Sequence, residues 1–252
     1  MSALRSEWTK LRTSPGTVWM LLGIVALTTG MSAASAATAG CPGGDGCAVD
    51  PARTGLIGVQ LGQAVVVALS VLVLGGEYGT GMIGVSLAAT PRRTSLLLAK
   101  AANLVVLVTV SGALGVLGSY VCSRLLLPSR GYHLAALTEP TILRAVGGSV
   151  LYLILISLLG LGLAATVREP AAAIGIVLGL LYVFPLITSV VSDKHWRRHL
   201  EQIQPMGAGL NIQATVNLHD LVLSPWAGLA VLAAWAFGAL IVGWLLLIAR
   251  DA

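Results

Sequence analysis

The sequence predicts an all-α membrane protein in which six transmembrane helices form one domain over residues 1–252. Two observations carry this prediction. First, 56% of the 252 residues are hydrophobic and only 10% are charged, with a mean hydropathy of +0.90, whereas soluble domains carry about 25% charged residues. Second, the chain holds six apolar runs of about 20 residues, the length that crosses a hydrocarbon core of about 30 Å as a helix. The short alternating segments typical of a β-barrel are not seen.

The six expected spans form a helical bundle, because backbone groups exposed to lipid must satisfy their own hydrogen bonds. Close helix packing is expected where glycines recur at four-residue spacing, at Gly58–Gly62 and Gly175–Gly179. A kink or an open hydrogen bond is expected at Pro185, inside the fifth span. The expected spans are residues 17–37, 55–75, 99–122, 145–167, 171–191 and 226–249.

Residues 1–14, before the first span, predict an interfacial helix. Leu4, Trp8 and Leu11 are spaced at i, i+4 and i+7, which gives one apolar face with Trp8 at the lipid headgroups. The alternative is an ordinary short tail. A cleaved secretory leader is disfavoured, because the apolar run is long and the leader carries Glu7.

The distribution of Lys and Arg predicts the orientation in the plasma membrane. Basic residues precede the first span and return in the loop after the second span, to which Arg92, Arg93 and Lys100 are assigned, while the first loop holds only Arg53. The positive-inside rule then places both termini, loop 76–99 and the turn at 168–170 in the cytoplasm. Later basic residues fall on the outer side of this topology: Arg124, Arg130, Arg144, Lys194, Arg197 and Arg198.

Two outer loops carry further expectations. Cys41 and Cys47 flank a short polar segment and would close a disulfide on an oxidising side, the alternative being free thiols. The loop at 192–224 combines charged and moderately apolar turns, and we expect it to be partly helical.

Several kinds of chemistry have no sequence signal. No phosphate-binding G-x-x-x-x-G-K-[ST] motif, H-E-x-x-H motif or G-x-S-x-G motif occurs. The segment Gly79–Gly84 matches G-x-G-x-x-G, but it follows a membrane span and not a strand. His195 and His199 lie four residues apart without a matching ligand cluster, so a charged turn is favoured over a metal site. No basic cluster is interleaved with aromatic residues, as a nucleic-acid-binding surface would need.

The expected span interiors also lack acidic and basic side chains, which ion-coupled transporters place at membrane depth. Energy for any transport would therefore come from another polypeptide. The polar residues inside the spans are Gln60, Gln63 and Asn103. An unpartnered buried amide costs about 1–3 kcal/mol, so these side chains should bond across helices or line a polar path, and helix packing is the favoured interpretation.

The segments 6–12 (SEWTKLR), 76–83 (GEYGTGMI) and 86–93 (SLAATPRR) together carry a resemblance. The sequence resembles the permease subunits of type-2 ABC exporters, especially actinobacterial drug and antibiotic-resistance exporters. The resemblance implies an interfacial N-terminal helix, six spans and a coupling helix between the second and third spans. At Gly84 this chain departs from relatives that often carry Arg or Lys.

The resemblance also implies partners and roles. Residues 77–93 would dock into a cleft of a separate ATP-binding subunit, with Arg168 and Glu169 as a second cytoplasmic contact. Two ATPase subunits would bind ATP and Mg²⁺, a second permease chain would complete a homo- or heterodimer in the bilayer, and this chain would hold no cofactor or catalytic residue. It would export a hydrophobic or amphipathic substrate. The docking residues implied are Glu77, Tyr78, Gly79, Thr80, Gly81, Met82, Pro91, Arg92 and Arg93.

Two alternatives to a permease remain open. The chain could be a membrane anchor or assembly subunit of a partner complex, which transports nothing. An intramembrane enzyme is disfavoured, because catalysis normally needs titratable groups and the expected spans lack the common ones.

Overall fold

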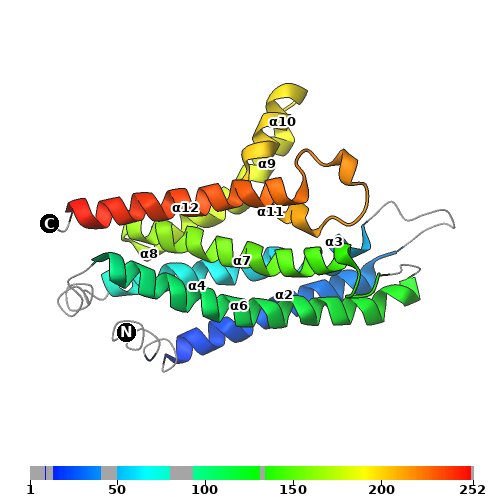
Figure 1. The fold of residues 1–252 in the computed structure, drawn as a ribbon, viewed down its shortest axis with the longest axis horizontal. Coiled ribbons are helices and arrows are strands. Elements are labelled where there is room, and N and C mark those ends of the chain that lie inside the picture. Colours follow the sequence, from blue (N-terminus) through cyan, green and yellow to red (C-terminus); the bar gives the residue numbers. More distant parts are fainter. Residues whose placement is uncertain (1–8, 10–13, 41–49, 80–92, 131–133, 251–252) are drawn as a thin grey trace.

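A computed structural model of the chain describes residues 9, 14–40, 50–79, 93–130 and 134–250. All regular secondary structure in these residues is helical, and six of the described helices are long and apolar enough to cross a membrane. The expected all-α class and the expected number of helices able to span a membrane are therefore confirmed (Figure 1). The spans are α2 (Pro15–Thr38), α4 (Val59–Gly79), α6 (Arg93–Leu126), α7 (Pro140–Val167), the continuous run α8–η2–α9 (Pro170–Leu178, Gly179–Val183, Phe184–Val190) and α12 (Pro225–Arg250).

Proline sets the start of several spans. Helices α2, α7, α8 and α12 each begin with a proline, whose missing N–H and fixed φ suit the first helical position. Helix α6 has 34 residues and is about 50 Å long at 1.5 Å per residue, well beyond the expected span of 99–122. The second span begins at Val59, later than expected, because the short helix α3 (Pro51–Gly55) occupies the preceding residues.

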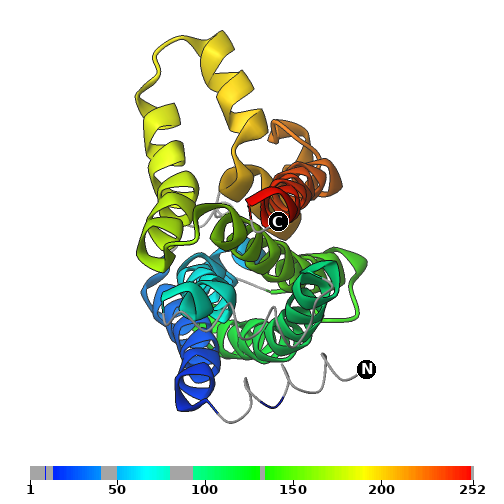
Figure 2. The same cartoon turned by 90° about the vertical axis from the view of Figure 1, so that its left-hand side faces the viewer.

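Helix α7 is the centre of the bundle. Its long buried face packs against α4, α6 and α12, and α2 covers the outer side of α4 and α6 (Figure 2). Glycines permit two of the closest approaches, since a Cβ at Gly58 would overlap the Thr28 carbonyl oxygen and one at Gly62 would overlap the Thr28 hydroxyl. Close packing at Gly58–Gly62 is thus confirmed. At Gly175–Gly179 that expectation is wrong within this chain, where no atom lies within 4 Å of an added Cβ.

The fifth span is interrupted next to Pro185, where the sequence predicted a kink or an open hydrogen bond. A π-helical turn, η2, precedes Pro185, and the Phe184 N–H bonds to the Gly179 carbonyl. A π turn accommodates the hydrogen bond that proline cannot make. Beyond this turn, α9 and the amphipathic helix α10 (Lys194–Ile203) project from the bundle (Figures 1 and 2).

The segment after the fifth span is partly helical, as expected. It contains α10, α11 (Pro205–Leu210), η3 (Asn211–Gln213) and η4 (Leu218–Asp220). Helix α11 is not solvated, because it packs against α7 and α12 with Ala208, Gly209 and Leu210 buried.

Asp50 fastens this segment to α3. Its buried carboxylate caps α3 by accepting a hydrogen bond from Ala52 N at 3.0 Å. The same carboxylate accepts bonds from the Thr215 hydroxyl at 2.7 Å, the Thr215 amide and the Val216 amide at 3.1 Å. One side chain therefore joins two connecting segments that are distant in the sequence.

Candidate coupling end and buried polar layer

One end of the bundle collects the chain segments that the resemblance assigns to coupling. Helix α4 ends there, α6 begins there, and the turn from α7 to α8 lies beside them (Figure 1). We call this the α4–α6 end, and the opposite end the α3 end. Residues 80–92 fall outside the described residues, and with them Thr80, Gly81, Met82, Pro91 and Arg92; the predicted interfacial helix (apart from Thr9 and Ser14), Cys41 and Cys47 also lie outside.

The described residues of the predicted coupling segment are helical. Glu77, Tyr78 and Gly79 form the last turn of α4, and Arg93 is the first residue of α6. Gly76 also belongs to α4, so the helix extends past the expected boundary at residue 75. Both ends of the predicted coupling segment therefore belong to spans.

Glu77 forms a buried ion pair with Lys100. The Lys100 ammonium lies 2.9 Å from Glu77 Oε1 and donates a second hydrogen bond to the Val73 carbonyl at 3.1 Å. Lys100 is only 1% exposed and Glu77 is 14% exposed. The expectation of charge-free span interiors is therefore wrong at Lys100, which was assigned to the loop. A carboxylate on the adjacent span compensates its charge, as a buried ammonium requires.

Arg168, of the predicted second cytoplasmic contact, packs against Tyr78, of the predicted coupling segment. The Arg168 guanidinium carbon lies 5.5 Å from the centroid of the Tyr78 ring, within the range of a cation–π interaction. Arg168 has φ = 62°, the left-handed conformation that ends many helices. Glu169 is exposed and caps α8 by accepting hydrogen bonds from the amides of Ala171 and Ala172. The α7–α8 turn is thereby fixed against the end of α4.

A second group of polar side chains lies toward the α3 end. The Tyr152 hydroxyl donates to Gln63 Oε1, and Gln63 Nε2 contacts the Met206 sulfur at 3.4 Å. One turn away, the Tyr182 hydroxyl of the π turn donates to the backbone carbonyl of Gln60. We call Gln60, Gln63, Tyr152 and Tyr182 the polar layer. It joins α4, α7 and the fifth span, which confirms that Gln63 bonds across helices.

The sequence interpretation omitted both tyrosines of the polar layer. A useful signal was present, since each is the single tyrosine of a largely aliphatic span, and a buried tyrosine hydroxyl usually finds a partner. Asn103 does not belong to this layer. It is buried in α6, one turn from Lys100, the partner of Glu77. Glu77 lies about 20 Å along α4 from Gln63 of the polar layer.

The described residues contain no group of three His, Cys, Asp or Glu side chains placed to hold a metal ion. His195 and His199 lie on exposed α10, with their Nε2 atoms 3.2 Å apart.

No family model matches the sequence, and no curated protein matches it.

Proposed function

We propose that this chain is the membrane-spanning permease of an ABC exporter, and that a separate subunit binds and hydrolyses ATP. Its α4–α6 end would face the cytoplasm and receive the ATPase, with residues 77–93 as the main contact and Arg168–Glu169 as the second. Two permease chains and two ATPase subunits would form the working complex. The cargo would be hydrophobic or amphipathic, carried outward across the plasma membrane.

The observation that carries this proposal is the contact between the two predicted docking elements. Tyr78 at the end of α4 and Arg168 at the α7–α8 turn are 90 positions apart in the sequence, yet they touch at one end of the bundle. A partner subunit seated on residues 80–92 would therefore also reach the turn. The resemblance supplies the identity of that partner.

The contacts described above indicate how force would pass inward. Residues 80–92 connect the end of α4 to the start of α6 in the sequence, and Lys100–Glu77 joins those two helices near these ends. Helix α8 is fixed to α4 through Arg168, and it leads to the π turn of the fifth span. A partner that binds one arrangement of these helices more tightly would shift the chain toward that arrangement.

Co-purification tests the docking step. The tagged chain is expressed in its native host, and the retained ATP-binding protein is measured for wild type, Arg168→Gln and Arg198→Gln. Both substitutions remove one guanidinium; Arg198 lies on exposed α10, far from the α4–α6 end. We expect several-fold less ATPase with Arg168→Gln and no change with Arg198→Gln.

Two results would count against the docking surface. One is equal retention of the ATPase by both variants at equal melting temperature. The other is the absence of any ATP-binding protein from the wild-type preparation, which would favour an anchor or assembly subunit.

A further inference from the structure

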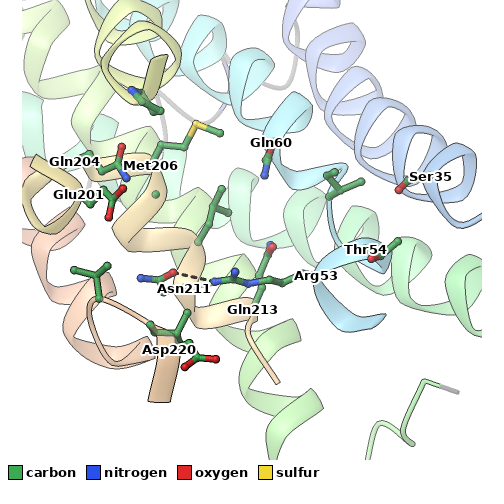
Figure 3. A pocket seen from close by; sticks show the side chains of 16 residues that line it. Ser35, Arg53, Thr54, Gln60, Glu201, Gln204, Met206, Asn211, Gln213 and Asp220 are labelled. Atoms are coloured by element: carbon green, nitrogen blue, oxygen red, sulfur yellow. Dashed lines mark hydrogen bonds between the residues drawn. The ribbon is translucent and has the colours of Figure 1, made fainter. Parts of the chain in front are cut away.

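A cavity of about 540 Å³ opens near the α3 end, between two separate parts of the chain. Arg53, Thr54 and Gln60 enter from one side, and Glu201, Gln204 and Met206 enter from the other (Figure 3). Its volume falls in the range of small-molecule sites, about 300–1,000 Å³. The polar layer borders it, since Gln60 lines the cavity and Met206 contacts Gln63.

Arg53 is the cationic group of this cavity. It is half-buried, and it donates one hydrogen bond, from Nη2 to Asn211 Oδ1 at 2.9 Å, across the cavity. No carboxylate of the described residues forms an ion pair with it. A guanidinium carries five N–H donors, so this geometry leaves donors available for an acceptor inside the cavity.

Neither carboxylate of the lining forms an ion pair with Arg53. Glu201 is paired with Arg197 at 2.9 Å. Asp220 belongs to the exposed turn η4.

An apolar surface completes the lining, formed by Ile57, Pro185, Met206, Leu210, Leu221 and Val222. The cavity thus offers a cation for an oxyanion and an apolar wall for a carbon skeleton.

We propose that this cavity binds an amphipathic molecule through an oxyanion, a carboxylate or phosphate, that lies on Arg53. The oxyanion would belong to an organic acid or to the headgroup of an anionic lipid. The site is formed by this chain alone, so its test is independent of the proposed ATPase partner.

Binding is measured on the whole chain alone, in nanodiscs of phosphatidylcholine, by equilibrium dialysis against empty nanodiscs. The probes are 6-hydroxy-2-naphthoate and its uncharged amide, which share the bicyclic skeleton and the hydroxyl group. We expect the wild type to bind the carboxylate about tenfold more tightly, which corresponds to about 1.4 kcal/mol.

Two variants and one control assign that preference. Arg53→Gln removes the guanidinium, and Asn211→Asp keeps an acceptor for Arg53 but neutralises its charge; both should bring the ratio of the two affinities close to one. Arg198→Gln removes a positive charge from α10 without touching the cavity lining and should keep the tenfold ratio. A preference that survives Arg53→Gln, or no saturable binding to the wild type, overturns the proposal.

A second experiment distinguishes a lipid headgroup from a soluble acid as the source of the oxyanion. The carboxylate probe is titrated into nanodiscs that contain phosphatidylglycerol in place of phosphatidylcholine. At least tenfold weaker probe binding there supports a lipid headgroup as occupant, whereas unchanged binding supports a soluble amphipathic acid.

Discussion

The buried pair Lys100–Glu77 gives the sharpest test of how the spans are held together. Lys100→Met keeps the length of the side chain and removes its charge. It removes the ammonium group that lies 2.9 Å from the Glu77 carboxylate, which is 14% exposed, between α4 and α6. Breaking a buried ion pair in this way costs about 3–5 kcal/mol, and the residual exposure of Glu77 places the expected loss at the lower end, about 3 kcal/mol.

The chain offers a matched control for this substitution. Arg197 and Glu201 form an ion pair at the same N–O distance, 2.9 Å, but Arg197 is 53% exposed. Arg197→Met should therefore reduce the free energy of unfolding by less than about 0.5 kcal/mol. The double variant Lys100→Met with Glu77→Gln should recover most of the loss, because neither charge then remains buried.

The assay is reversible unfolding in mixed micelles by increasing the mole fraction of a denaturing detergent, followed by tryptophan fluorescence. With the single variant Glu77→Gln added, the wild type, the two single variants and the double variant give the pair energy by a double-mutant cycle. If Lys100→Met were as mild as Arg197→Met, the pair would not be buried, and the correction to the charge-free spans would fail.

Three further predictions address packing, the polar layer and orientation. Gly58→Ala should lower the free energy of unfolding by about 1–3 kcal/mol, because the new methyl group would overlap the Thr28 carbonyl oxygen; Gly147→Ala, with no atom within 4 Å of its Cβ position, is the control and should not lower it, because alanine is the better helix former. Tyr152→Phe should cost about 1–3 kcal/mol by removing the donor to Gln63 Oε1, and adding Gln63→Leu should restore part of that loss; additive losses in the same unfolding assay would argue against the bond. For orientation, Leu218→Cys in a chain whose three cysteines are replaced by serine should react with a membrane-impermeant maleimide on intact cells, and Ala171→Cys only after permeabilisation. The reverse labelling pattern would invert the topology.

The spans could be predicted because each depends on the composition of a single continuous run. Lys100 could not be placed in the same way. It stands at the edge of an apolar run, so it looked like a loop residue, and its partner Glu77 becomes visible only when α4 and α6 pack together.

The contacts at the α3 end could not be predicted either, because they join segments that are distant in the sequence. Asp50 bonds to Thr215 and Val216, which are more than 160 positions away, and α11 is buried although its sequence looks like a loop. Arg53 marked only an outer loop in the sequence. Its place in a cavity depends on Asn211 and Gln204, which are brought to it by the projecting α9 and α10.

The central proposal, a permease driven by a separate ATPase, is tested most directly by reconstitution. The co-purified ATPase is assayed for ATP hydrolysis in proteoliposomes with the wild-type chain, with Arg168→Gln, with Arg198→Gln, and without the chain. We expect hydrolysis to be stimulated several-fold by wild type and Arg198→Gln and to fall toward the chain-free rate with Arg168→Gln. Hydrolysis at the same rate in all four preparations would contradict the proposal.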